Sequence, residues 1–212
     1  MKLDLRCYLV TSGTGEHTVE TAARAAAAGA GLVQVRAKDA PARELLDLTC
    51  TLAERVRGAN PETKVVVNDR VDVALAARDR GAHVHGVHLG QDDLPVESAR
   101  ALLGPEAIIG LTTGTLDLVR AADDRRHLLD YVGAGPFRLT PTKDSGRRPL
   151  GVAGYRELVA ATELPIVAIG DVGPADAPDL ARTGVAGVAL VRALMSAPDP
   201  ARVVHRVARA FT

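Results

Sequence analysis

The sequence predicts a closed α/β barrel of the TIM type, a (β/α)8 fold that forms a single domain over residues 1–212. Short runs rich in Val, Ile and Leu alternate eight times with longer Ala-rich runs of helical character. The short runs are almost continuously apolar, which is typical of parallel strands buried on both faces. No Gly-x-Gly-x-x-Gly motif follows the first strand, which weakens the alternative of an open dinucleotide-binding sheet. In such a barrel the chemistry lies at the C-terminal ends of the strands.

Turn and cap signals divide the chain into strand and helix units. Gly29 suits the C-terminal end of the first helix, and Pro41 suits the first turn of the second, where its missing N–H would be unbonded anyway. The strands are expected at residues 5–10, 32–36, 64–68, 84–89, 107–111, 130–133, 166–169 and 185–190. The helices are expected at residues 18–28, 41–57, 71–80, 95–103, 116–126, 151–161, 174–183 and 198–210, with a short extra helix at 191–195.

The composition favours one compact domain without a charged interaction surface. Hydrophobic residues make up 47% of the 212-residue chain, enough for one full core. Lys plus Arg and Asp plus Glu both number 26, so no net field attracts nucleic acid or an anionic membrane. Cys7 and Cys50 are expected to be reduced core residues. No leader-like start and no run near ~18 apolar residues is present, so we expect a cytoplasmic protein without a membrane partner.

The second strand carries polar residues at alternate positions. Gln34, Arg36 and Lys38 should therefore share one side of the strand and point toward the barrel axis and its mouth. Two cations and an amide suit an anion such as a phosphate or diphosphate. A salt-bridge layer inside the barrel is the structural alternative.

Carboxylates follow two successive strands. Asp69 comes directly after the third strand, and Asp92 and Asp93 come after the fourth, so these acids should meet at one edge of the barrel. Carboxylates held close together require a positive partner, and Mg²⁺ is the usual one. The alternative is local: Asn68 and Asp93 would cap the following helices, and Asp69 would lie in a first helical turn.

Two further groups near these strands have structural alternatives. His83, His85 and His88 suggest zinc, but alternation along a strand gives poor geometry for convergent ligands, and His88 is interpreted as a packing residue. Thr112 and Thr113 end the fifth strand and offer hydroxyl groups to a ligand, or they cap the next helix.

The last three strands lead into glycine-rich loops suited to phosphate. A loop of about 17 residues follows the sixth strand, and its length indicates a lid or binding loop. Its Thr140, Thr142 and Lys143 supply hydroxyls and a positive charge. The loops after the seventh and eighth strands, with the short extra helix, form a backbone phosphate site in many barrels. The arrangement indicates two phosphorylated ligands bound together.

The chain resembles the thiamine-phosphate synthase family over essentially its whole length, and the motifs that carry the resemblance lie at the predicted strand ends. Four motifs carry the resemblance, in order: Gln34-Val35-Arg36-Ala37-Lys38, Asn68-Asp69-Arg70, Gly86-Val87-His88-Leu89-Gly90-Gln91-Asp92-Asp93, and Gly133-Ala134-Gly135-Pro136 followed by Thr140-Pro141-Thr142-Lys143. The resemblance implies a Mg²⁺-dependent transferase that joins 4-amino-2-methyl-5-hydroxymethylpyrimidine diphosphate to 4-methyl-5-(2-phosphoethyl)thiazole. The products would be thiamine phosphate and diphosphate.

The matching motifs also imply roles for single residues. Asp69 and Asp93 would carry Mg²⁺. The residues that would hold the pyrimidine diphosphate are Gln34, Arg36, Lys38, Asn68, Thr112 and Lys143. The residues that would hold the thiazole phosphate are Thr140, Thr142, Gly170, Asp171, Val191 and Arg192. Arg36, Lys38 and Lys143 would also be catalytic, because they meet the negative charge that develops on the departing diphosphate.

Two positions depart from the family pattern. Asp171 stands where a second glycine is usual, and Arg192 stands where a serine is frequent. A carboxylate beside a bound phosphate is repulsive, so we expect Asp171 to contribute its N–H while its side chain turns outward and pairs with a cation. Two other functions remain open: a thiazole-phosphate tautomerase on the same barrel, which would need a poised base and no metal, and a non-catalytic phosphate-binding regulator. The sequence also leaves open whether the chain forms a homo-oligomer.

Overall fold

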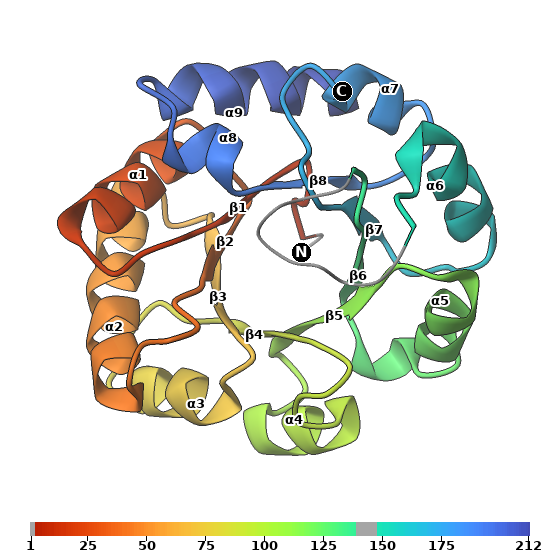
Figure 1. Cartoon of the computed structure of the whole chain (residues 1–212). Coiled ribbons are helices and arrows are strands. Elements are labelled where there is room, and N and C mark those ends of the chain that lie inside the picture. Colours follow the sequence, from red (N-terminus) through yellow and green to blue (C-terminus); the bar gives the residue numbers. More distant parts are fainter. Residues whose placement is uncertain (1–2, 139–147) are drawn as a thin grey trace.

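Eight parallel strands close into one barrel, and helices surround it (Figure 1). The computed structural model describes residues 3–138 and 148–212. Each strand pairs with its neighbours in chain order, and β8 closes the barrel against β1. The strands are β1 Cys7–Val10, β2 Leu32–Val35, β3 Lys64–Asn68, β4 Gly86–Leu89, β5 Ile108–Thr113, β6 Tyr131–Ala134, β7 Ile166–Ala168 and β8 Gly187–Leu190.

The helices follow the strands in the predicted order. They are α1 Glu16–Ala27, α2 Ala42–Ala59, α3 Val71–Asp79, α4 Val96–Leu103, α5 Leu116–Asp123, α6 Gly151–Ala160, α7 Ala177–Ala181, α8 Arg192–Met195 and α9 Pro200–Ala208, with 3-10 turns η1 Arg126–Leu128 and η2 Arg209–Phe211. The predicted extra helix after the last strand is therefore confirmed as α8. The predicted helix at 174–183 is much longer than α7, and the one predicted at 116–126 ends at Asp123, before the separate 3-10 turn η1 begins at Arg126.

The residues at which α3, α4 and α5 begin show which of the predicted helix caps are present. Thr115 caps α5, because its side chain accepts a hydrogen bond from the Leu118 N–H at 3.3 Å. Thr112 and Thr113 both lie inside β5, so the interpretation of these residues as caps is wrong. At α3 and α4 the cap positions are Arg70 and Pro95, and neither makes a side-chain cap bond. The caps proposed for Asn68 and Asp93 are therefore wrong as well.

Alternation along the strands produces two apolar layers. The larger layer packs the outer face of the barrel against the helices. The smaller layer fills the barrel interior, and its buried members are Leu5, Tyr8, Val10, Leu32, Val66, Tyr131, Val167 and Ala189. Cys7 and Cys50 are unpaired, as expected, and Cys7 is buried.

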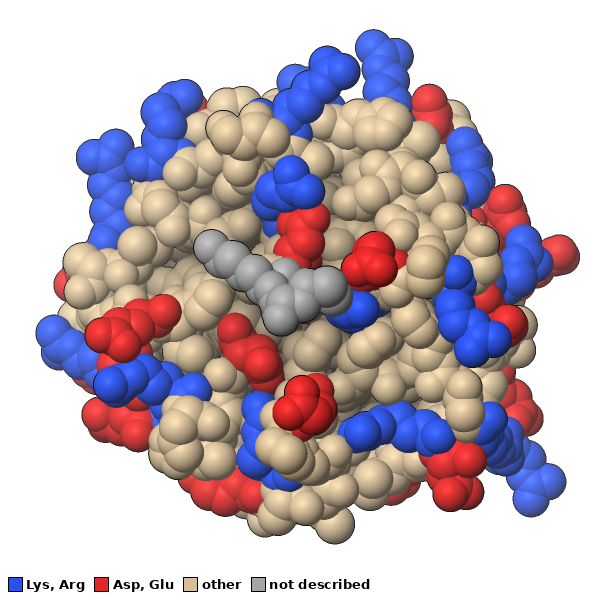
Figure 2. Space-filling model, turned by 180° about the vertical axis from the view of Figure 1, so that it is seen from behind, with Lys and Arg blue, Asp and Glu red and all other residues tan. Residues whose placement is uncertain are grey.

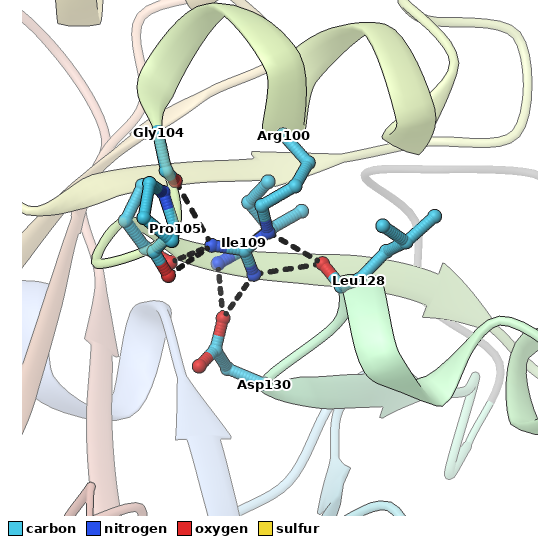
Figure 3. A network of polar contacts seen from close by, with 7 residues as sticks. Arg100, Gly104, Pro105, Ile109, Leu128 and Asp130 are labelled. Carbon is cyan, nitrogen blue, oxygen red and sulfur yellow. Dashed lines mark hydrogen bonds and ion pairs between the residues drawn. The ribbon is translucent and has the colours of Figure 1, made fainter.

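An arginine links the segments that precede β5 and β6 at the N-terminal end of the barrel (Figure 3). The guanidinium of Arg100, from α4, donates to the carbonyl of Leu128 at 2.8 Å and to the carboxylate of Asp130 at 3.0 Å. It also donates to the carbonyls of Gly104, Pro105 and Ala107. Asp130 in turn accepts from the Ile109 N–H at 2.8 Å. The network supplies hydrogen-bond donors to carbonyls in the segments that precede β5 and β6.

Charges of both signs are interspersed on the face that Figure 2 shows, with no broad region of one sign. Within residues 3–138 and 148–212, none of the helices has the length and apolar character needed to cross a lipid bilayer.

Candidate active site

The carboxyl ends of all eight strands lie at one end of the barrel, because all strand pairs are parallel. The predicted site residues that the structure describes lie at or just after these ends. Thr140, Thr142 and Lys143 fall outside the described residues.

The two acids predicted at neighbouring strand ends do meet. Burial raises the pKa of Asp69, a hydrogen bond and charge repulsion from the Asp93 carboxyl raise it further, and Lys38 opposes the rise. Asp69 is not in a first helical turn, contrary to the local alternative. Its backbone adopts the left-handed region with φ 61°, and its N–H donates to the His88 carbonyl at 2.8 Å. The Asp69 side chain lies beside Asp93 and Lys38.

The Asp93 carboxylate is held by its own loop. Its Oδ2 accepts the Gly90 N–H at 2.6 Å, while Asp92 beside it is exposed. Within the described part of the chain, no three His, Cys, Asp or Glu side chains form a group that could hold a metal ion by themselves. Two carboxylates with room for further oxygen ligands suit Mg²⁺, which usually keeps water and takes substrate phosphate oxygens.

The polar residues of the second strand lie where alternation predicted them. Gln34 is inside the barrel and 3% exposed, and its amide donates to the Tyr8 hydroxyl. Lys38 is exposed and its Nζ lies 3.8 Å from Asp69 Oδ2. The Arg36 guanidinium has no ion-pair partner among the described residues, and the Arg36 backbone N–H donates to the buried Thr11 hydroxyl at 3.0 Å. The alternative of a salt-bridge layer inside the barrel is therefore wrong: the cations lie at the mouth.

Thr112 projects toward the site from β5 and contacts a histidine. His88 Nε2 lies 3.0 Å from the Thr112 hydroxyl, and His88 Nδ1 lies 3.0 Å from the hydroxyl of Tyr131. The histidine is buried, as a packing residue would be, but it is also hydrogen-bonded at both ring nitrogens. Sequence reasoning missed Tyr8 and Tyr131. The signal that could have identified them is a side chain with a hydroxyl group at a position of an apolar strand that faces the barrel interior.

The predicted phosphate loops meet through an ion pair. Asp171 has a left-handed backbone with φ 56°, and its carboxylate pairs with the Arg192 guanidinium, as expected from the departures at these positions. Gly170 has φ 99°, and a Cβ there would lie 2.6 Å from the Cα of Pro136, so only glycine fits. Val191 immediately precedes α8. A second arginine, Arg138, donates to the Asp171 carbonyl at 3.1 Å.

Arg138 also connects the segment just after β6 to the segment just after β7. It forms an ion pair with Asp176, and the neighbouring Phe137 N–H donates to the Ile169 carbonyl at 2.9 Å. The Asp176 pairing lowers the pKa of that carboxyl, and Arg138 is the main cause. The loops after β6, β7 and β8 are thus connected by arginines.

Known proteins share this architecture and sequence. The profile of the thiamine monophosphate synthase family matches residues 7–194, a range that contains every candidate site residue. A thiamine-phosphate synthase of Corynebacterium efficiens is 61% identical over 98% of this chain and 95% of its own length. One of Moorella thermoacetica is 38% identical over 99% and 96%.

Solved structures agree with the sequence matches. A thiamine phosphate pyrophosphorylase from Pyrococcus furiosus superposes with a TM-score of 0.83 at 32% identity, covering 99% of this chain and 96% of that one. A 3-hexulose-6-phosphate synthase at 17% identity, with a TM-score of 0.66, shares the fold alone. The chain therefore belongs to the thiamine monophosphate synthase family.

Proposed function

We propose that the chain joins the pyrimidine diphosphate to the thiazole phosphate at the mouth of the barrel. Membership of the family assigns it the activity of a thiamine-phosphate synthase, a transferase that acts on small molecules. The observation that carries the proposed site is the convergence of Asp69 and Asp93 beside Lys38 at one barrel edge. Acids alone would repel a diphosphate, so this mixture of charges suits a diphosphate bound through a cation.

Asp69 and Asp93 would hold Mg²⁺ in this proposal. The ion, when bound, supplies positive charge to the oxygens of the leaving diphosphate. The Gly90 N–H fixes one Asp93 oxygen, and the Asp69 backbone bond to His88 fixes the other strand end, so both carboxylates are oriented before a ligand arrives.

The remaining groups act on the two substrates. Arg36 and Lys38 would meet the charge on the departing diphosphate, together with Lys143, which lies outside the described residues. Gln34, Asn68 and Thr112 would orient the pyrimidine, whose amino group helps to stabilise the cation left at the methylene carbon.

The second substrate would lie against the loops after β7 and β8. Gly170, Asp171, Val191 and Arg192, with Thr140 and Thr142, would hold the thiazole phosphate. Holding the ring nitrogen over the methylene carbon makes a bimolecular step local, which is worth up to ~7–11 kcal/mol. The reaction then needs no protein nucleophile. The proposal also includes a cytoplasmic location, which the unpaired Cys7 and Cys50 support, and it requires neither nucleic acid nor membrane.

A turnover assay tests the proposal. Diphosphate release is followed with both substrates, with and without Mg²⁺, for the natural protein and for Asp93→Ala. We expect metal-dependent turnover that Asp93→Ala lowers by a factor on the order of 100, since a charge-stabilising group is lost. Asp92→Ala is the matched control, because Asp92 is exposed beside it. No metal-dependent turnover in the natural protein would refute the synthase, and an unchanged rate in Asp93→Ala would remove that residue from the metal site.

A further inference from the structure

A continuous row of hydrogen bonds crosses the barrel interior between two of the proposed substrate-binding residues. The Gln34 amide nitrogen donates to the Tyr8 hydroxyl, which lies 2.9 Å from the Tyr131 hydroxyl. Tyr131 Oη lies 3.0 Å from His88 Nδ1, and His88 Nε2 lies 3.0 Å from Thr112 Oγ1. We call these five residues the interior row. Its end residues, Gln34 and Thr112, lie near the C-terminal ends of β2 and β5, and the three residues between them are buried.

The barrel is built to accommodate the interior row. Gly110 stands between His88 and Tyr131 in the strand register. A Cβ at Gly110 would lie 2.2 Å from Tyr131 Cζ and 2.6 Å from His88 Nδ1, which is closer than a Cβ approaches any non-bonded atom in real structures. At Gly133 a Cβ would lie 3.1 Å from His88 Cε1. Glycines in adjacent strands thus make space for the stacked His88 and Tyr131 rings, whose centroids are 5.5 Å apart.

The hydrogens along the interior row have one consistent direction. Because Tyr8 accepts from Gln34, its own hydrogen goes to Tyr131, the other partner that the structure gives it. Tyr131 then donates to His88 Nδ1, which must be unprotonated, so His88 carries its hydrogen on Nε2 and donates to Thr112. Burial raises the pKa of both tyrosines, so their hydroxyls stay protonated and can donate.

This direction fixes what each end presents to a ligand. Gln34 uses its amide nitrogen inside the barrel and keeps its carbonyl oxygen as an acceptor. Among the described residues no fully buried side-chain oxygen lacks a partner, so this oxygen, for which no partner is found there, is not fully buried. Thr112 accepts from His88 and therefore keeps its hydroxyl hydrogen as a donor.

We propose that Tyr8, Tyr131 and His88 are positioning residues that orient Gln34 as an acceptor and Thr112 as a donor toward one substrate. An amino group at one end and an anionic oxygen at the other match this pair, and an aminopyrimidine diphosphate has both. The inference rests on the proposed function and deepens it. None of the three positioning residues needs to touch the reacting atoms.

The tautomer of His88 tests the direction without any variant. In a ¹⁵N-labelled sample of the full chain at neutral pH, long-range ¹H–¹⁵N spectra should show His88 with a protonated Nε2 and an unprotonated Nδ1. His88→Gln assigns the signal. If the Gln34 amide were turned the other way, every hydrogen in the interior row would reverse and Nδ1 would be protonated. Observation of that tautomer, or of a doubly protonated ring, would overturn the inference.

Variants test the link to the substrate. Tyr131→Phe keeps the ring and removes the hydroxyl, and it should raise KM for the pyrimidine diphosphate about tenfold, which is about 1.4 kcal/mol. KM for the thiazole phosphate should stay within about twofold, because Gly170, Asp171, Val191 and Arg192 of its proposed site follow β7 and β8, which carry no member of the interior row. Tyr155→Phe is the matched control, since Tyr155 is equally buried and donates to the Ala134 carbonyl at 2.8 Å outside the interior row. It should lower Tm without changing the KM for the pyrimidine diphosphate.

A double-variant comparison separates positioning from general loss of structure. In a Thr112→Val background, Tyr131→Phe should raise KM for the pyrimidine diphosphate less than it does alone, because part of its effect passes through Thr112. Equal effects in both backgrounds, or equal KM changes in Tyr131→Phe and Tyr155→Phe, would refute the inference. If Tyr131→Phe does not fold, the measured tautomer of His88 alone decides whether the inference holds. An inactive natural protein would count against the proposed function instead, because the tautomer is measured without turnover.

Discussion

His85 should make the folded state less stable as the pH falls, and the structure gives the size of the effect. The residue lies just before β4, at the end of the barrel away from the candidate site, and its ring meets His83 edge-on with centroids 4.4 Å apart. Burial, followed by the positive potential of His83 and Lys64, lowers the pKa of His85 from 6.5 to about 4.

The direction of this change in stability follows from proton uptake by the unfolded chain. Between pH 6.5 and about 4 the unfolded chain binds a proton at His85 that the folded chain does not, so the free energy of unfolding decreases as the pH falls through this window. At about 1.4 kcal/mol per pH unit, the pKa difference sets an upper bound of about 3.4 kcal/mol. The ring is only partly buried, so solvent screening reduces the expected effect to about 1–2 kcal/mol.

Urea unfolding at pH 7.5 and at pH 4.5 measures this effect. His85→Gln should lose less stability between these pH values than the natural protein, by about 1 kcal/mol. His127→Gln is the control, because His127 is an exposed histidine in the turn η1. The reasoning would fail if His85→Gln and the natural protein lost the same free energy of unfolding on acidification.

Three further predictions concern packing and charge. Gly110→Ala should destabilise the fold by about 1–3 kcal/mol in urea unfolding, because its Cβ would overlap Tyr131; natural stability would contradict the close approach. Arg100→Ala should cost about 2–3 kcal/mol in the same assay, since carbonyls and Asp130 lose their donor, and a cost below about 0.5 kcal/mol would show that water replaces it. Arg192→Ala should raise KM for the thiazole phosphate about tenfold and Asp171→Asn should lower it. Equal changes in both variants would argue against a phosphate at this pair.

The order of the elements was predictable because burial in a parallel barrel leaves a clear pattern. Runs such as Val65-Val66-Val67 have no exposed face, and each is followed by an amphipathic helix. The boundaries were less predictable. The fourth strand was expected from Val84 but begins at Gly86, although the His85 N–H already donates to the Val65 carbonyl at 2.7 Å and the His85 carbonyl accepts from Ile108 at 2.9 Å.

The site residues at strand ends were predictable as a set, and their local conformations were not. Asp69 looks in the sequence like a residue of a first helical turn, but its N–H donates to the neighbouring strand and its backbone is left-handed. That contact depends on which strand lies alongside, and no local pattern contains it. The Asp171–Arg192 pair was predictable because both residues depart from the family pattern at facing loops.

The interior row could not be predicted from any single strand. Tyr8 and Tyr131 lie 123 residues apart, and each reads as an ordinary strand aromatic. Only the closed barrel brings their hydroxyls together, and only the absence of a Cβ at Gly110 leaves the space for them.

The ion pair between Asp171 and Arg192 also bears on how a phosphorylated ligand would leave. Arg192 already has a counter-ion in the free protein, so an arriving phosphate exchanges with a carboxylate and gains less than it would from a lone arginine. The proposed substrate and the proposed product carry the same phosphate, so whatever retains one also retains the other. We expect the resident carboxylate to limit that retention and to compete for the arginine whenever the phosphate moves away, which favours release over trapping of the product.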